Sequence, residues 1–208
     1  MKTGYTHITI LLDRSGSMTS AAPDVRGGIA TFIDEQKKVP GDCTISINQF
    51  DGEFQTDYNF ANIQDVESNI KFEPRGYTAL YDGIGRAINQ TGARLDELNE
   101  SEKPEKVIFV IFTDGAENAS REFSYNDIKE LVTKQTETYS WSFTFLGANI
   151  DAMATGSSLG FSLGSTIDYD VSKTKDVYSM LSSKTALYRS SSDASMDFND
   201  DDRKTSVA

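Results

Sequence analysis

The sequence has only one histidine, His7, and only one cysteine, Cys43, among its 208 residues. A single cysteine cannot form an internal disulfide, and an absence of paired cysteines is typical of a reducing compartment. No cluster of cysteines and histidines is available as soft metal ligands. A cation site in this chain would therefore be built from oxygen ligands.

Basic residues are also scarce: the sequence has 20 Lys and Arg but 32 Asp and Glu, which gives a formal net charge of −12. Because phosphate binding needs a basic patch, this balance argues against a nucleic-acid-binding surface. The sequence has no run of about 18 apolar residues, so it predicts no membrane span. Residues 1–13 become charged before they could form the apolar region of a signal peptide. We therefore expect a cytoplasmic protein that binds neither nucleic acid nor membrane.

Apolar runs of strand length alternate with helical patterns. Two of these runs, 7–13 and 106–114, resemble the buried centre of a parallel sheet. Asp51-Gly52 predicts a hairpin, which adds one antiparallel edge strand. The predicted strands are 7–13, 43–51, 53–60, 106–114, 140–148 and 165–170, and the predicted helices cover about 25–33, 80–98, 124–132, 151–160 and 173–189. This order predicts an α/β fold: a Rossmann-like, open, mostly parallel six-stranded sheet with helices on both faces.

Residues 1–190 make up the predicted domain. From residue 191 onward the composition becomes polar and acidic, with five aspartates between residues 193 and 202. Segments of this composition bury too little apolar surface to fold on their own. We therefore expect residues 191–208 to form a mobile tail, whose carboxylates would allow weak self-association.

Two predicted strands end on an aspartate, Asp13 and Asp114. Open α/β sheets bind ligands outside the carboxyl ends of their strands, where the strand order reverses. If the two strands are neighbours, both carboxylates face one pocket, and like charges so close need a cation or a shared proton. Ser15 and Ser17 follow Asp13, and Thr78 begins the long helix near the same rim. Carboxylates and hydroxyls suit a hard cation, and Mg²⁺ or Mn²⁺ fits better than Zn²⁺.

Two other chemistries compete for these serines: a nucleophilic serine and a phosphate-binding loop. A Ser-His-Asp triad needs a histidine, but His7 begins the first predicted strand, roughly 20 Å from Asp13 at about 3.3 Å per residue. The nucleophile motif G-x-S-x-G does not occur at the serines, and the P-loop motif G-x-x-x-x-G-K-[ST] does not occur in the sequence. The residue types therefore favour a cation site.

The pattern D-x-S-x-S at 13–17, Thr78 in a separate segment and T-D-G at 113–115 resemble the metal-ion-dependent adhesion site of von Willebrand factor type A domains. The resemblance extends over roughly residues 5–190 in the order of the elements. Within the family, the chain looks like the small stand-alone type A proteins of bacteria and their phages, so the cytoplasm would be that of the host if a phage encodes it. Two further segments match that group: ENASREF (117–123) and FLGAN (145–149).

The resemblance implies a metal site formed by Asp13, Ser15, Ser17, Thr78 and Asp114. In the family pattern the three hydroxyls ligate the metal directly, and the two aspartates act partly through water. The implied cation is Mg²⁺, with Mn²⁺ or Ca²⁺ as alternatives. The implied partner is a protein that supplies an Asp or Glu side chain to the metal.

The leading interpretation is therefore a metal-dependent protein-binding module of the adhesion type, and not an enzyme. Two alternatives stay open. A metal-dependent phosphohydrolase-like enzyme would need a general base near the metal, and without a histidine at the rim only Glu117 or Asp82 is a candidate. A metal-free interaction scaffold would bind its partners without a cation. We interpret Glu117 and Asn118 as part of a surface loop.

Overall fold

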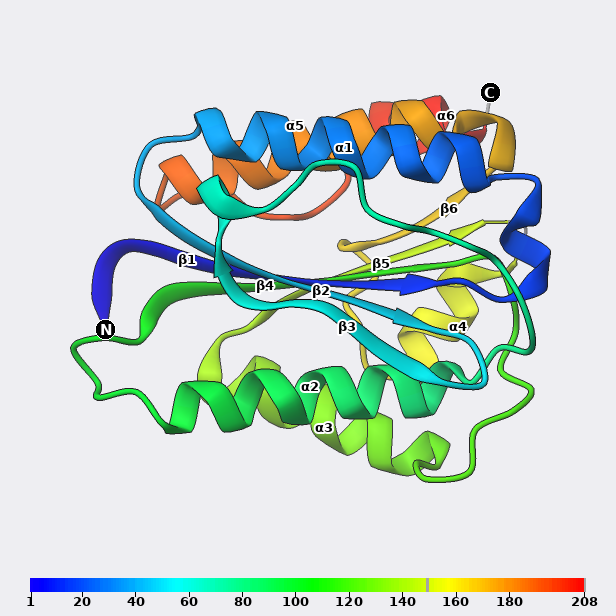
Figure 1. Cartoon of the computed structure of the whole chain (residues 1–208), viewed down its shortest axis with the longest axis horizontal. Helices are drawn as coiled ribbons and strands as arrows, with labels where there is room; N and C mark the ends of the chain where they lie inside the picture. Colours follow the sequence, from blue (N-terminus) through cyan, green and yellow to red (C-terminus); the bar gives the residue numbers. More distant parts are fainter. Residues whose placement is uncertain (149, 208) are drawn as a thin grey trace.

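A six-stranded sheet forms the centre of the structure, a computed structural model that describes residues 1–148 and 150–207 (Figure 1). Its strands are β1 (Lys2–Asp13), β2 (Asp42–Phe50), β3 (Phe54–Asn62), β4 (Pro104–Thr113), β5 (Ser142–Ala148) and β6 (Thr166–Tyr169). They lie in the order β3-β2-β1-β4-β5-β6, and only the pairing of β3 with β2 is antiparallel. The predicted α/β fold class is confirmed, including the antiparallel edge strand.

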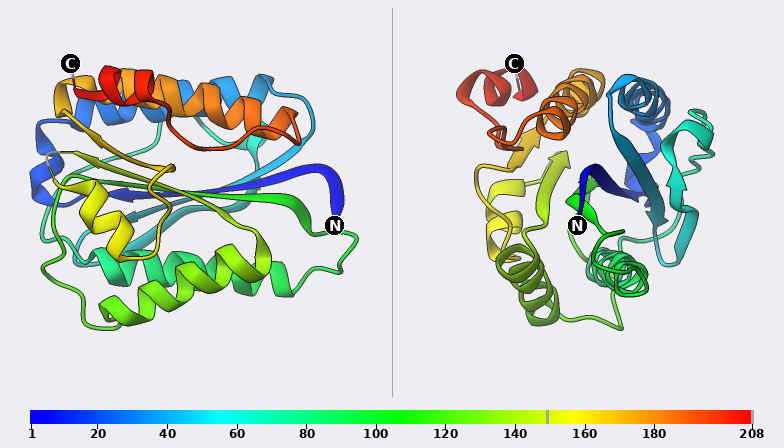
Figure 2. Two further views of the ribbon diagram at one scale, coloured as in Figure 1. Left: turned by 180° about the vertical axis from the view of Figure 1, so that it is seen from behind. Right: turned by 90° about the vertical axis from the view of Figure 1, so that its left-hand side faces the viewer.

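Helices cover both faces of this sheet (Figures 1 and 2). They are α1 (Ala22–Lys38), α2 (Leu80–Asp96), α3 (Tyr125–Tyr139), α4 (Ala152–Ser158), α5 (Thr174–Ser190) and α6 (Asp200–Val207). Helices α1, α5 and α6 lie on one face, and α2, α3 and α4 lie on the other. Phe32 and Tyr178 belong to the apolar cluster under the first group, and Phe109 and Trp141 to the cluster under the second. Because the second half of β1 and most of β4 are covered on both faces, the sequences of these parts, Ile8–Leu12 and Val107–Phe112, are mostly apolar.

The strand order reverses between β1 and β4. The chain leaves β1 through α1 to reach β2 on one side, whereas β4 lies on the other side of β1. In the register of this parallel pair, Leu12 lies opposite Phe112, so β1 and β4 end next to each other. Open α/β sheets bind ligands at such a reversal, and the predicted site residues follow these two strand ends.

Two local features of the sequence, a helix cap and a helix glycine, have clear roles in the structure. Ser124 caps α3 by accepting a hydrogen bond from the backbone of Asp127, whose side chain accepts one from the backbone of Ser124. This reciprocal pair is the capping box that the sequence indicates. Gly83 allows α2 to approach β2 closely, because a Cβ at this position would lie 2.7 Å from Cγ of Phe50.

Strand β1 is longer than predicted. It begins at Lys2, so His7 lies inside the strand rather than at its start. His7 is fully buried, stacks on Phe60 with 3.6 Å between ring centroids, and hydrogen-bonds the hydroxyls of Thr44 and Thr9. Burial lowers the pKa of His7 to about 3, so the ring is neutral at physiological pH. The early part of the strand was missed because it is exposed and polar, with no apolar pattern to mark it.

The segment 191–207 differs from the mobile tail that we expected, because it packs against the domain. Met196 and Phe198 are buried in the same apolar cluster as residues of α1 and α5. Arg203 in α6 donates a 2.8 Å hydrogen bond to the backbone oxygen of Thr166 in β6. The average composition of the segment is polar and does not reveal that Met196 and Phe198 pack against the core.

Two residues named in the sequence analysis, Asn149 at the end of FLGAN and Ala208 at the end of the expected tail, lie outside the described residues. Residues 145–148 of FLGAN form the end of β5. Within the described ranges, no helix combines the length and the apolar character needed to cross a membrane.

Two adjacent glycines in α1 allow a matched test of its packing against α5. A Cβ at Gly28 would lie 2.5 Å from Cγ of Tyr178, so one helix would have to move. We expect Gly28→Ala to lower the free energy of unfolding by about 1–3 kcal/mol, as overpacking does. Gly27 is exposed, and apart from the neighbouring backbone of α1 itself, a Cβ there would meet no atom of the described residues within 4 Å.

Gly27→Ala should therefore leave the free energy of unfolding unchanged or raise it by up to about 1 kcal/mol. Urea unfolding, followed by circular dichroism, measures both variants against the wild type. A Gly28→Ala variant as stable as Gly27→Ala would contradict the close contact between α1 and α5.

Candidate metal centre

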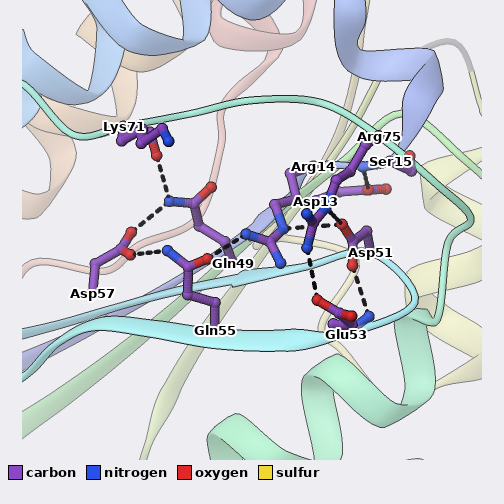
Figure 3. Close-up of polar contacts among 10 residues, drawn as sticks. All are labelled: Asp13, Arg14, Ser15, Gln49, Asp51, Glu53, Gln55, Asp57, Lys71 and Arg75. Carbon is purple, nitrogen blue, oxygen red and sulfur yellow. Dashed lines mark hydrogen bonds and ion pairs between the residues drawn. The ribbon is translucent and has the colours of Figure 1, made fainter.

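The buried carboxylate of Asp13 joins the ends of the two central strands. Asp13 is the last residue of β1 and is 0% exposed. Its Oδ2 accepts a 2.7 Å hydrogen bond from the hydroxyl of Thr113, the last residue of β4. Its Oδ1 accepts a 2.7 Å hydrogen bond from the backbone N–H of Ser15 (Figure 3). One carboxylate thus fixes both the strand pair and the start of the serine loop.

The hydroxyls of the serine loop reach across to the second aspartate. Ser15 Oγ lies 3.0 Å from Ser17 Oγ, and Ser17 Oγ donates a 2.5 Å hydrogen bond to Asp114 Oδ1. Ser15 is buried, whereas Ser17 is exposed and Asp114 is half-buried. The row of oxygens therefore runs from the core to the solvent.

Thr78 closes the group from a third loop. A Cβ at Gly115 would lie 3.0 Å from Thr78 Oγ1 and 3.7 Å from Ser17 Oγ. The T-D-G sequence needs its glycine because a larger residue there would intrude between these two hydroxyls. The structure therefore brings all five predicted site residues, including Asp13 and Asp114, to one edge of the sheet.

Burial disfavours the charged forms of both aspartates. It raises the pKa of Asp13 to about 6, and the charge of Asp114 adds to the effect, although the hydrogen bonds from Thr113 and Ser15 oppose it. Burial also raises the pKa of Asp114, against the hydrogen bond from Ser17. Two acids held so close make this edge a place where a cation would be stabilised.

Tyr169 is a neighbour of the site that the sequence analysis did not identify. It ends β6 and is 3% exposed. Burial raises the pKa of the Tyr169 phenol well above its usual range, and the charges of Asp114 and then Asp13 raise it further. Tyr169 is therefore a neutral, buried neighbour of the two acids.

The segment after the site holds the Thr78 loop and is more than a surface loop. Thr78 N–H donates a 2.9 Å hydrogen bond to Asn118 Oδ1, and Asn118 N–H donates a 3.0 Å bond to the Thr78 carbonyl. Glu117 accepts a 2.9 Å hydrogen bond from Tyr81 N–H in the first turn of α2. These contacts were missed because they join residues about 40 positions apart. The polar sequence E-N-A-S was their only sign.

The donor set fits a hard divalent cation. It consists of two carboxylates and three hydroxyls, and oxygen ligands of this kind suit Mg²⁺, Mn²⁺ or Ca²⁺. Among residues 1–148 and 150–207, no three His, Cys, Asp or Glu side chains gather into a metal-ligating group. A cation at this edge would depend on Ser15, Ser17 and Thr78 as much as on the two acids.

Comparison with known proteins points to one family. The von Willebrand factor type A domain family matches residues 7–160 of the chain. A search of curated proteins finds no match. Many solved structures share the fold, and three illustrate the range.

The von Willebrand factor domain of the type V pili tip protein Mfa5 from Porphyromonas gingivalis has a TM-score of 0.67 at 8% identity, and the alignment covers 91% of this chain and 98% of that one. Proximal thread matrix protein 1 from the mussel byssus, with a zinc-occupied MIDAS motif, has a TM-score of 0.62 at 15% identity, over 88% of this chain and 46% of that one. A von Willebrand factor type A protein from Catenulispora acidiphila has a TM-score of 0.59 at 14% identity, over 88% and 43%.

The chain thus spans less than half the length of the mussel and Catenulispora proteins. At these identities the structural likeness shows the fold alone. The family match is more specific, because residues 7–160 run from β1 through α4 and include all three loops of the candidate metal centre. The chain belongs to the von Willebrand factor type A domain family.

Proposed function

We propose that this protein is a metal-dependent protein-binding module of the adhesion type. The observation that carries the proposal is the meeting of Asp13, Asp114 and the hydroxyls of Ser15, Ser17 and Thr78 at one edge of the sheet. These five residues would hold the cation. Ser17 is exposed and Asp114 is half-buried, so a partner can reach the site from solvent.

We propose Mg²⁺ or Mn²⁺ as the cation, with Ca²⁺ as an alternative. When bound, a divalent cation supplies an electrophilic centre that an anionic oxygen of a partner can approach. Three of the five proposed ligands are neutral hydroxyls, so the protein places at most two negative charges there. The mussel protein with a zinc-occupied motif is a reason to include Zn²⁺ in the titrations.

The proposed ligand is an Asp or Glu side chain of another protein. The net charge of −12 repels an acidic partner at long range. The attraction must therefore come from the site itself and must depend on the cation. A metal-free scaffold would lack this attraction and would show no preference for acids.

The hydrogen bonds of the two general-base candidates weigh against the phosphohydrolase alternative. The Glu117 carboxylate accepts hydrogen bonds from backbone N–H groups of Tyr81, Ala119 and Ser120. The Asp82 carboxylate accepts three more, from the backbone of residues 121–123. Carboxylates held in this way are not free to take a proton from an attacking water. Hydrolysis of p-nitrophenyl phosphate with Mg²⁺ or Mn²⁺ would support the alternative, and we expect none above background.

Self-association through the C-terminal aspartates and a cytoplasmic location are lesser parts of the proposal. Asp202 pairs with Lys184 at 2.7 Å, with both side chains 17% exposed, so it is not free to reach a second molecule. Asp193, Asp197 and Asp200 are exposed and stay available, whereas Asp201 is exposed but pairs with Lys204 at 3.3 Å. The cytoplasmic location, in a bacterium or in the host of a phage, rests on the lone Cys43, a buried thiol.

The first test is stabilisation by metal. Addition of Mg²⁺ or Mn²⁺ to metal-free protein should raise its melting temperature, because a ligand that binds only the folded state stabilises it by RT ln(1 + [L]/Kd). At a concentration 100-fold above Kd, the gain is about 2.7 kcal/mol. Differential scanning fluorimetry measures the shift, with NaCl at matched ionic strength as the control. An unchanged melting temperature up to roughly millimolar metal, where weak oxygen sites bind, would contradict the proposal.

The second test is Asp13→Asn. This variant should lose metal binding but should be more stable than the wild type when both are metal-free at pH 7. Burial raises the folded-state pKa of Asp13 to about 6 from the ordinary value of 3.8 for an aspartate. The contribution of Asp13 to stability is therefore fully present below about pH 4 and is lost as the pH rises through about 6. Asparagine avoids this loss, because it stays neutral and keeps a side-chain oxygen for the Ser15 N–H.

Urea unfolding with chelator at pH 4 and pH 7 measures the difference between the two proteins. We expect the stability advantage of Asp13→Asn to grow by about 2–3 kcal/mol between these pH values, as follows from a folded-state pKa of about 6 in place of the ordinary value for an aspartate. An advantage that is independent of pH would show that burial does not raise the pKa of Asp13 in the folded protein. Normal metal binding by the variant would show that the metal site lies elsewhere.

The third test concerns the partner. Peptides selected from a displayed random library on the immobilised protein in Mg²⁺ should be released by EDTA and should be enriched in Asp or Glu. Parallel selections without metal, and on Asp13→Asn, should show no such enrichment. Acid-free peptides that bind equally well in chelator would favour the metal-free scaffold.

A further inference from the structure

We infer that Asp51 is a positioning residue for the metal centre: it locks the serine loop and the Thr78 loop together. Asp51 directly follows β2 and is not among the five proposed metal-site residues. Figure 3 shows the contacts of its carboxylate with Arg14, Arg75 and the backbone of Glu53. The inference rests on the proposed function, since it concerns how the proposed metal site is held.

The Asp51 side chain makes three contacts and is 3% exposed. Oδ2 accepts a 2.9 Å hydrogen bond from Arg75 Nε and forms an ion pair with Arg14 Nε at 3.1 Å. Oδ1 accepts a 2.7 Å hydrogen bond from the backbone N–H of Glu53. One buried carboxylate thus holds two guanidinium groups and also closes the turn between β2 and β3.

The two arginines belong to the loops that carry the proposed metal ligands. Arg14 lies between Asp13 and Ser15, and Arg75 lies three residues before Thr78. Their backbones are joined as well, because Arg75 N–H donates a 2.7 Å hydrogen bond to the Arg14 carbonyl. By binding both side chains, the Asp51 carboxylate fixes the spacing between the serine hydroxyls and the hydroxyl of Thr78.

The backbone of Asp51 reinforces the same link. Its carbonyl accepts a 3.1 Å hydrogen bond from Ala79 N–H, directly after Thr78. Gly16 N–H, between the two serines, donates a 3.2 Å bond to the Gly76 carbonyl. The Thr78 loop is therefore tied on one side to Asp51 and to the serine loop, and on the other side to Asn118.

The charges explain why an acid is needed at position 51. The Arg14 side chain is only 7% exposed, and a buried guanidinium without a counter-ion is strongly unfavourable. Its other contact, from Nη1 to the Gln55 side-chain oxygen at 2.5 Å, is with a neutral group. Without the Asp51 charge, Arg14 would be driven toward solvent and would pull on the loop that holds Ser15.

The inference is tested by Mn²⁺ affinity, measured by electron paramagnetic resonance of the free ion. Asp51→Asn should weaken Mn²⁺ binding by about 10–100-fold, as loss of a group that orients metal ligands does. The matched control is Asp202→Asn, which removes a partly buried ion pair with Lys184 between α5 and α6. This control should leave the Mn²⁺ affinity unchanged, even if it lowers the melting temperature.

Arg75→Gln separates positioning from simple electrostatics. Removing a positive charge near a cation site would by itself tighten Mn²⁺ binding. If Arg75 acts through Asp51 to hold the loop, binding should instead become several-fold weaker. The Arg75 side chain is 59% exposed, so this variant should fold even if Asp51→Asn does not.

Wild-type affinity in Asp51→Asn, or tighter binding by Arg75→Gln, would overturn the inference while leaving the proposed metal site intact. Failure of the wild-type protein itself to bind Mn²⁺ would instead overturn the proposed function, and the inference with it. Weaker binding by both variants, with normal binding by Asp202→Asn, is the result that we expect.

Discussion

The burial of the Asp13 carboxylate is the constraint on which the rest of the site depends. Asp13 ends the central strand, where the sheet is covered on both faces, so its charge has little access to water. Hydrogen bonds from Thr113 and Ser15 N–H stabilise the charge but do not compensate for the loss of solvent, and the pKa stays raised. The fold therefore holds an unfavourable charge where its strand order reverses. A proton or a cation relieves it.

Residues outside the proposed ligand set give the three loops their geometry. Loops at a sheet edge are mobile unless their backbone groups are bonded. Here Asn118 bonds Thr78 on one side and Asp51 holds Arg14 and Arg75 on the other. A metal site placed on loops needs such support, because small displacements of its oxygens change the coordination.

Helix α2 and the segment after Asp114 also support each other, because side chains of each accept hydrogen bonds from the backbone of the other. The first turn of α2 has N–H groups without helical partners, and Glu117 and Ser120 accept hydrogen bonds from two of them. In return, Asp82 in that turn accepts three N–H groups of residues 121–123. This exchange joins the helix that follows Thr78 to the segment that follows Asp114, so the Thr78 loop and the Asp114 loop are held together.

The parts of the fold that could be predicted from the sequence are those with a local signature. Apolar runs mark β1 and β4, and each of these strands ends at or next to an acid, so both strand-end carboxylates could be identified from the sequence. That the two strand ends are neighbours depends on the strand order of the sheet. The roles of Asn118 and Asp51 could not be predicted, because each depends on partners brought near only by folding. The docking of 191–207 was missed for a related reason: Met196 and Phe198 mean little until a core exists to receive them.

The overall charge and the proposed site have opposite effects on an acidic partner, and this opposition gives the proposed function its selectivity. Without a cation, Asp13 and Asp114 contribute to the net charge of −12, so an acidic ligand is repelled both at long range and at contact. A divalent cation would offset the negative charge only at the site, and an acid that misses it would still meet repulsion. Discrimination thus comes from the unfavourable alternatives as much as from the favourable contact. A neutral or basic surface would bind acids weakly in many places, whereas the proposed site would allow a cation-dependent contact at one place.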